Sequence, residues 1–254
     1  MSDFDRNYAA PRRSVGMDRT IAIDEGLRAY MIRVYNYMAA GVALTGVVAW
    51  LTFNSAAVVD SAGRLVGLTP FGQMLYSGPA SIVLFLATLG LVFLISFRIG
   101  SLTPSTAFTL FMVYAALLGL MLSSIFLTYT HTSIARVFFI SAASFGALSL
   151  YGYTTQRDLS PIGSFLWMGL IGLLIAMVVN LFLQSPMFQF VISAAGVLIF
   201  AGLTAWDTQR IKEMYDPQED GTIVGRKAVM GALKLYLDFI NIFIFLLQLF
   251  GDRR

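Results

Sequence analysis

Long apolar runs, separated by short polar breaks, fill the chain from about residue 30 to residue 250. A helix that crosses a bilayer needs about 20 mainly apolar residues, because the hydrocarbon core is about 30 Å thick and a helix rises about 1.5 Å per residue. Seven runs have this length, and each predicts one transmembrane helix. The expected spans are residues 30–53, 78–97, 105–129, 134–153, 162–183, 187–211 and 228–250.

Proline marks most of the breaks between these runs. It opens a helix at little cost, since the first N–H groups of a helix have no partner within it. The remaining loops, residues 54–77 and 208–227, are too short for a soluble domain. We therefore expect an all-α polytopic membrane protein, with an N-terminal segment over residues 1–27 and a single seven-helix membrane domain over residues 28–254.

The composition agrees with this interpretation. The 254 residues are 57% hydrophobic and only 12% charged, with a mean hydropathy of +0.76, whereas soluble domains carry about 25% charged residues. A soluble enzyme, a disordered tail and a disulfide scaffold are excluded, the last because the chain has no cysteine. The net charge of +3 comes from bases that flank apolar runs. Such bases indicate contact with anionic lipid head groups rather than with nucleic acid.

The distribution of lysine and arginine predicts the orientation, because basic loops stay on the cytoplasmic side. With a cytoplasmic N-terminus, twelve bases fall inside and four outside: Arg6, Arg12, Arg13, Arg19, Arg28, Arg33, Arg98, Arg157, Arg210, Lys212, Arg226 and Lys227, against Arg64, Arg136, Arg253 and Arg254. We therefore expect the N-terminus in the cytoplasm and the C-terminus outside. The mixed segment over residues 20–37 either lies in the membrane interface or forms the polar first turns of span one.

The usual catalytic patterns are missing. The sequence has no P-loop, no dinucleotide fingerprint and no His-Glu-x-x-His motif, and its only histidine is His131. We therefore expect no enzyme activity and no resident cofactor. Small residues within spans, such as Gly146 and Gly172, are more typical of close helix packing than of ligand binding.

Two acidic residues lie within the apolar runs, Asp207 in span six and Asp238 in span seven. A carboxylate at membrane depth costs roughly 2.5–3.5 kcal/mol on insertion scales, so it needs a partner or a proton. Asp238 lies about ten residues, or about 15 Å, into its expected span. Because these two spans are antiparallel and joined by one loop, both acids fall in the same half of the membrane, and they can meet face to face.

Two carboxylates that meet in a dry site cannot both ionise cheaply, so they share one proton and titrate as a unit. Such a pair can act as a pH sensor. When deprotonated, its hard oxygens suit a cation such as calcium, although calcium usually takes 6–8 oxygen ligands. Asp207 and Asp238 are therefore expected to bind calcium weakly and transiently, as a conduction path requires.

Simpler roles remain open for each charged residue. Asp207 could lie at the water interface, paired with Arg210 one turn further along the helix. Asp238 could hydrogen-bond Tyr236, Asn241 or a neighbouring helix as a purely structural contact. Arg98, at the inner end of span two, is either a positive-inside anchor or a counter-ion that reaches Asp207 and closes the inner mouth.

Three stretches carry a family resemblance: FAGLTAWDTQRIK at 200–212, ALKLYLDFINIF at 232–243 and LRAYMIRVYNYMAAG at 27–41. Together they resemble the transmembrane Bax-inhibitor-motif family (Bax inhibitor-1 and YccA-like proteins), and the short tails look most like its bacterial members. The resemblance implies a bundle whose last helix is central and wrapped by the other six, and a pH-dependent calcium leak. It also implies that Asp207 and Asp238 form a two-aspartate pH sensor, with Arg98 as its arginine partner.

The resemblance leaves two hypotheses. The first is a pH-sensitive calcium or cation leak channel in a bacterial inner membrane, gated by proton binding to the two aspartates. The second is a membrane-embedded regulator without transport, because some bacterial relatives bind the membrane protease FtsH and animal relatives restrain cell death. For the regulator, the N-terminal segment and the loop 208–227 would be the exposed segments that a partner protein contacts. An intramembrane enzyme with two catalytic aspartates is a third alternative, but nothing in the sequence marks a cavity for a scissile bond.

Overall fold

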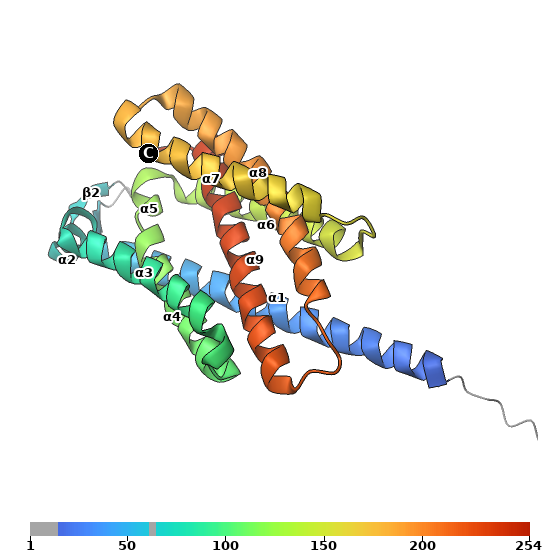
Figure 1. Cartoon of the computed structure of the whole chain (residues 1–254). Helices are drawn as coiled ribbons and strands as arrows, with labels where there is room; N and C mark the ends of the chain where they lie inside the picture. Colours follow the sequence, from blue (N-terminus) through green and yellow to red (C-terminus); the bar gives the residue numbers. More distant parts are fainter. Residues whose placement is uncertain (1–14, 61–64) are drawn as a thin grey trace, which may run out of the picture.

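The chain is a bundle of long helices (Figure 1). The computed structural model describes residues 15–60 and 65–254. Seven helical segments are long and apolar enough to cross a membrane, which confirms the seven expected spans. In chain order the elements are α1 (Val15–Ala56), β1 (Ala57–Val59), β2 (Leu65–Leu68), α2 (Pro70–Ser77), α3 (Pro79–Arg98), the 3-10 turn η1 (Ile99–Ser101), α4 (Pro104–Leu122), α5 (Ile125–Thr128), α6 (His131–Thr154), α7 (Ser160–Leu183), α8 (Pro186–Glu213) and α9 (Gly221–Phe250).

The course of the first helix decides whether residues 20–37 lie in the membrane interface or form the first turns of span one. α1 is one continuous helix from Val15 to Ala56, so this segment continues into span one rather than lying apart from it. Residues 15–27 of the expected N-terminal segment therefore belong to α1, and residues 1–14 lie outside the described residues. The region expected only as a loop, 54–77, holds the antiparallel hairpin β1–β2 and the short helix α2.

The loop between α8 and α9 is shorter than expected. It covers only residues 214–220, because α8 continues to Glu213 and α9 already begins at Gly221. Asp220 caps α9, since its Oδ1 accepts the backbone N–H groups of Thr222 and Ile223, each at 2.8 Å. Asp238 therefore lies about 26 Å of helix from the first residue of α9, rather than the expected 15 Å.

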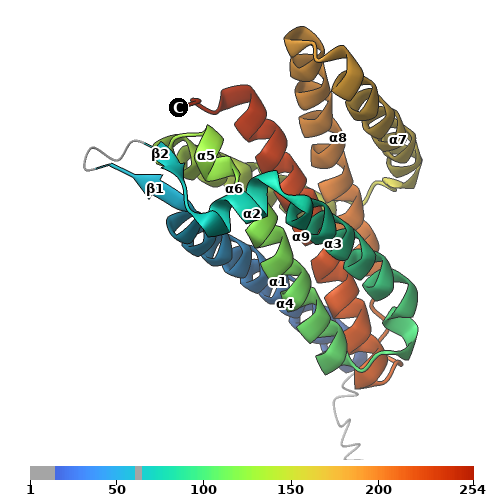
Figure 2. The ribbon, with the colours of Figure 1, turned by 90° about the vertical axis from the view of Figure 1, so that its left-hand side faces the viewer.

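α9 is the central helix of the bundle (Figures 1 and 2). In its most apolar window 72% of the residues are buried, against 11–33% in the other six spans. The resemblance implied a central last helix surrounded by the other six, and α9 packs mainly against four of them, α1, α4, α6 and α8. α3 packs on α4 and α7 packs on α8, so these two helices form an outer layer that presents most of its apolar surface to lipid.

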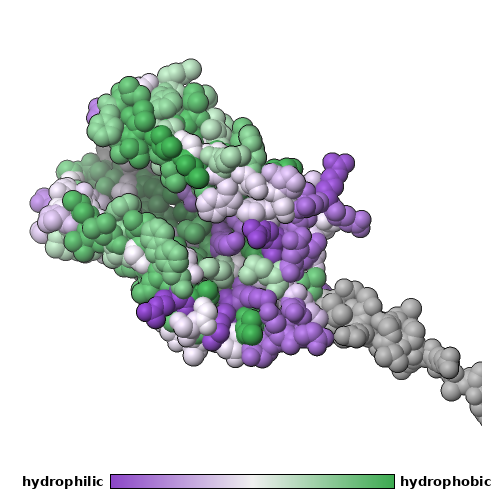
Figure 3. All heavy atoms as spheres, in the orientation of Figure 1, coloured by the Kyte–Doolittle hydropathy of each residue, from purple (hydrophilic) through white to green (hydrophobic). Residues whose placement is uncertain are grey.

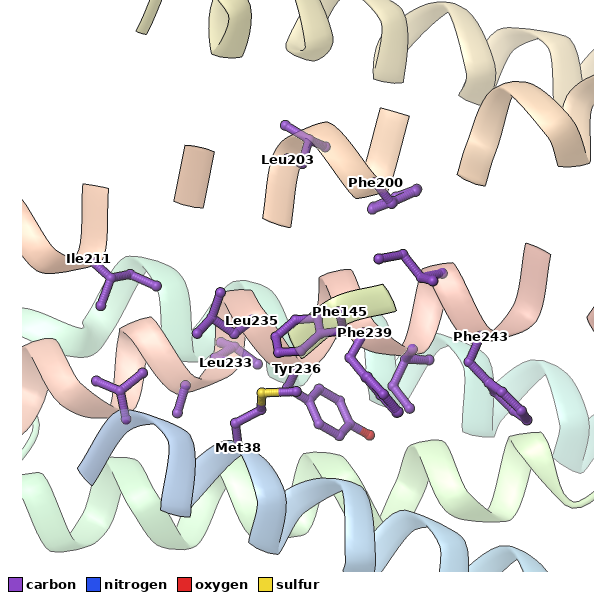
Figure 4. Close-up of a cluster of buried hydrophobic side chains, with 14 of the residues drawn as sticks. Met38, Phe145, Phe200, Leu203, Ile211, Leu233, Leu235, Tyr236, Phe239 and Phe243 are labelled. Carbon is purple, nitrogen blue, oxygen red and sulfur yellow. The ribbon is translucent and has the colours of Figure 1, made fainter. Parts of the chain in front are cut away.

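Aromatic and aliphatic side chains of α9 form the core with α1, α6 and α8 (Figure 4). Tyr236 is fully buried, and its ring meets Phe111 edge-on with 5.4 Å between ring centres. Its hydroxyl lies 2.6 Å from Thr45 Oγ1, whose own proton goes to the carbonyl of Ala115 at 2.9 Å. The Tyr236 hydroxyl therefore donates to Thr45, which satisfies both hydroxyls in the core.

Close helix contacts occur at glycines other than those expected. A Cβ at Gly152 would collide with the backbone of Ala205, and one at Gly163 would collide with the ring of Trp206. These two glycines let α6 and α7 approach α8 around the segment that carries Asp207. Gly146 and Gly172 have open space where a Cβ would stand, so their expected packing role is wrong.

Candidate functional site: a buried acid and lysine cluster between α8 and α9

The structure brings Asp207 and Asp238 together across the contact between α8 and α9. The side chains of the two acids interact with each other across this contact. Asp207 is 9% exposed and Asp238 is 4% exposed. Neighbouring residues on both helices, among them Trp206, Thr208 and Phe239, are also buried. The two acids therefore share one site that is largely closed to solvent.

Lys234 is the cation of this site. Its Nζ lies 3.3 Å from Asp207 Oδ1 and forms a salt bridge with it. On α9 it stands one turn before Asp238, so both side chains project from the same face of the helix. The Lys234 side chain is 37% exposed and that of Asp207 is 13% exposed, which makes the lysine the most open member of the group. Asp207, Asp238 and Lys234 are called the acid cluster below.

The charge of the acid cluster depends on one proton. Two ionised carboxylates and one ammonium carry a net charge of −1, and an added proton makes the group neutral. Asp238 Oδ2 is buried and has no hydrogen-bond partner among the described residues. An ionised oxygen without a partner is costly in such a place. A proton shared by the two carboxyl groups removes this cost and balances the charge.

Of the simpler partners considered for the two aspartates, Arg210, Tyr236 and Asn241 make other contacts, whereas a contact of Asp238 with a neighbouring helix is present, to Asp207 of α8. Arg210 stacks over the ring of Trp206, 5.0 Å from its centre, and acts on Asp207 only through its charge. Tyr236 bonds to Thr45, and the Asn241 amide donates to the carbonyl of Leu237 at 2.8 Å. Within the described part of the chain, the partners of the two aspartates are therefore each other and Lys234.

Arg98 is the sequence-derived site residue that the structure does not bring to the site. It ends α3 and its side chain is exposed. Among residues 25–60 and 65–254, no salt bridge joins it to Asp207 or Asp238. Its role as a counter-ion stays a prediction for another conformation.

Lys234 was missed as a site residue, although a signal for it is present. Lys234 and Asp238 are four residues apart in an apolar run, so they must lie on one helix face. A lysine at that spacing in a central helix needs an acidic partner, because a buried ammonium without one is costly.

Beyond the acid cluster, the contact between α8 and α9 becomes apolar. Phe200 and Phe245 stack with 5.9 Å between ring centres, and Leu203, on the same helix as Phe200, is also buried (Figure 4 labels Phe200 and Leu203). Gly196 has no side chain, and the Phe245 ring occupies the space where its Cβ would stand. The contact between the two helices is therefore apolar and closely packed over this stretch.

A second polar group lies at the far end of the same helix pair. Gln248 Oε1 accepts from Gln189 Nε2 at 3.0 Å and from Ser193 Oγ at 2.8 Å, and Gln189 Oε1 accepts from Asn180 Nδ2 at 2.9 Å. These four residues are called the amide cluster below. They line a cavity of about 320 Å³ together with Arg253. The helix pair is thus polar at both ends and apolar between them.

A closed metal site is absent from the described residues. No group of three or more histidine, cysteine, aspartate or glutamate side chains in residues 25–60 and 65–254 could hold a metal ion. The two carboxylates of the acid cluster provide too few oxygens for stable calcium coordination. Any cation that meets them keeps part of its hydration shell.

The fold and the acid cluster define a class of protein: a seven-helix membrane protein built around a central last helix, with two buried acids between that helix and the one before it. The family model described as "Inhibitor of apoptosis-promoting Bax1" matches residues 27–254. The chain therefore belongs to the Bax inhibitor family.

Several bacterial proteins are similar to the chain over most of its length. Inner membrane protein YbhL of Escherichia coli K12 is 44% identical over 232 residues, which cover 90% of this chain and 94% of YbhL. Protein RP147 of Rickettsia prowazekii is 48% identical over 231 residues, covering 91% of this chain and 92% of that protein. A protein of Caulobacter vibrioides is 43% identical over 261 residues and covers both chains completely.

Proposed function

We propose that the protein is a pH-sensitive leak channel for calcium, or a similar cation, in a bacterial inner membrane. Its gate is the acid cluster, in which Asp207 and Asp238 bind protons and Lys234 balances their charge. The observation that carries the proposal is the contact of two buried carboxyl groups with each other and with one lysine. The similarity to YbhL, an inner membrane protein, supports the choice of membrane.

The proposed gate works through net charge. With one shared proton the acid cluster is neutral, and it attracts a cation only weakly. Loss of the proton leaves one negative charge beside hard oxygens, which suits a partly hydrated cation passing through. Conduction also requires the apolar stretch around Phe200 and Phe245 to widen, so both charge and packing have to change together.

The proposed orientation places the sensor near the cytoplasm. The basic residues predict a cytoplasmic N-terminus, and the start of α1 lies at the same end of the bundle as the loop between α8 and α9 (Figure 1). Purple, hydrophilic residues gather at this end in Figure 3, while the remaining surface of that view is mostly green. Asp207 lies six residues, or about 9 Å, from the end of α8. The acid cluster therefore responds to cytoplasmic rather than external pH.

Flux measurements in liposomes test the proposal. Purified full-length protein is reconstituted around a calcium dye, and calcium entry is recorded across a pH series. We expect entry that changes with pH in a single step, and a flat pH profile when Asp207→Asn and Asp238→Asn are combined. Asp158→Asn is the matched control, because Asp158 is a loop residue bonded to the N–H of Ser160 and lies outside the acid cluster.

Two results would contradict the channel. One is the absence of calcium entry at every pH, with the protein folded in the vesicles. The other is a pH profile that keeps its shape in the double variant. A regulator of a membrane protease such as FtsH would give the first result, and capture of the protease by the full-length protein, lost on deleting the N-terminal segment, would then support that alternative.

A further inference from the structure

A second cavity lies between α1 and α6, on the lipid-facing side of the bundle. Its volume is about 500 Å³. Its interior is lined mainly by apolar side chains, among them Met31, Phe145 and Leu150. Gly146 stands in its wall with no atom within 4 Å of where a Cβ would be. The cavity is thus an open, apolar groove at the depth of the acyl chains.

The mouth of this groove lies at the end of the bundle that carries the loop between α8 and α9. Arg28, near the start of span one, and Tyr153, one residue from the end of α6, both line it. Phe145 stands eight residues before Tyr153, so the groove runs about 12 Å inward from the mouth. A ligand that fits has a head at the membrane surface and an apolar tail.

One basic side chain lines the mouth, and a second contacts a residue that lines it. Arg28 lines the groove and is exposed. Lys212 of α8 does not line the groove but contacts Tyr153, which does: its Nζ lies 5.7 Å from the centre of that ring and 2.9 Å from the Tyr153 carbonyl oxygen. Within the described side chains, neither base has an acidic partner. The head of the ligand is therefore anionic.

The wall of the groove is bonded to the helix that carries Asp207. Tyr35 and Ser149 both line the groove, and their hydroxyl oxygens are 2.7 Å apart. Ser149 Oγ is in turn 3.0 Å from Oγ1 of Thr208, the residue after Asp207. A molecule in the groove thus rests on a chain of hydroxyls that joins α1, α6 and α8.

We propose that this groove binds one anionic phospholipid, with its phosphate between Arg28 and Lys212 and one acyl chain across Gly146 toward Phe145. A lipid is the occupant, because the groove opens to the bilayer along its apolar length and is basic only at the membrane surface. A soluble anion would leave the apolar part unfilled. The proposal concerns binding alone and stands whether or not the protein conducts ions.

Lipid-dependent thermal stability tests the site. Full-length protein in a neutral detergent is titrated with phosphatidylglycerol, phosphatidylcholine or glycerol phosphate, and the melting temperature is followed, because a ligand of the folded state raises it by mass action. We expect phosphatidylglycerol to act at about tenfold lower concentration than phosphatidylcholine, equivalent to about 1.4 kcal/mol. Glycerol phosphate, which has the head group without a chain, gives no shift.

Two variants and their matched controls locate the effect. Gly146→Leu fills the groove and abolishes the preference for phosphatidylglycerol, while Gly172→Leu, at another lipid-facing glycine with open space, keeps it. Arg28→Gln weakens the preference about fivefold, the effect of one base near an anionic head group. Arg33→Gln removes an exposed arginine of the same helix that does not line the groove, and leaves the preference unchanged.

Three results would overturn the proposal. The first is an equal response to both phospholipids in the wild type. The second is a full response to glycerol phosphate, which would indicate a site for a soluble anion. The third is a preference for phosphatidylglycerol that survives both Gly146→Leu and Arg28→Gln, which would indicate general attraction of the basic end to anionic lipid.

Discussion

The two ends of the α8 and α9 contact are both polar, yet they are built on different principles. At one end, the amide cluster consists of neutral groups, and Gln189, Ser193 and Gln248 all have hydrogen-bond partners inside the cluster. At the other end, the acid cluster holds three ionisable groups, and Asp238 Oδ2 has no hydrogen-bond partner within the described part of the chain. The apolar stretch around Phe200 and Phe245 separates them.

The comparison distinguishes polar groups that only hold helices together in a membrane from polar groups that can respond to pH. Satisfied amides hold helices together and do not depend on pH. Buried carboxyl groups cost more, and their charge changes when a proton binds or leaves. If the contact between the two helices required only stability, neutral amides at both ends would be sufficient. A response to pH is therefore expected at the acid cluster. The amide cluster, whose groups are neutral, serves as the comparison within the same protein.

The larger effect is expected from Lys234→Met, which removes the positive charge of the acid cluster. Proton binding by the two carboxyl groups becomes more favourable without that charge, so the midpoint of the calcium flux profile moves to higher pH. We also expect a loss of about 1–2 kcal/mol in unfolding free energy. This is below the 3–5 kcal/mol of a fully buried pair, because Lys234 is partly exposed and screened by solvent.

The control for this variant is Lys234→Arg, which keeps the charge and leaves the midpoint near that of the wild type. Lys227→Met serves as a second control, since Lys227 pairs with Glu219 in the loop and not with the acid cluster. A flux midpoint that stays in place in Lys234→Met would show that this lysine does not balance the two aspartates.

A smaller effect is expected from Gln248→Leu at the amide end. It leaves Gln189 Nε2 and Ser193 Oγ without their shared acceptor, which costs about 1–2 kcal/mol in unfolding free energy. The pH profile of the flux keeps its shape, because no charged group is changed. Gln218→Leu, at an exposed loop position, controls for the loss of an amide. A shift of the pH midpoint in Gln248→Leu would remove the distinction between the two ends.

The spans could be predicted from the sequence because bilayer thickness alone fixes the length of an apolar run. The meeting of Asp207 and Asp238 could also be predicted as possible, since consecutive antiparallel helices with a short connection lie side by side. The exact register was not, because it depends on local fits such as that of Gly231 against Ile211. The hairpin β1–β2 was missed because its strands of three and four residues are too short to show a periodic pattern.

The counter-ion was the main part of the site that sequence reasoning left out. Arg98 was considered for its position at a helix end, but α3 packs on α4 in the outer layer of the bundle. Lys234 lies on the central helix itself, where spacing along one chain decides what it faces. Charges within the same buried helix are thus better guides to a membrane site than charges at the ends of peripheral helices.

The protonation of the acid cluster can be measured directly by infrared difference spectroscopy of the carboxyl C=O stretch in the reconstituted protein. We predict one protonated carboxyl group at neutral pH that is lost in a single step on alkaline titration. The signal is absent in Asp238→Asn, in which Asp207 remains ionised beside Lys234, and it is unchanged in Asp158→Asn. A wild-type spectrum in which both aspartates are already ionised well below neutral pH would contradict the account.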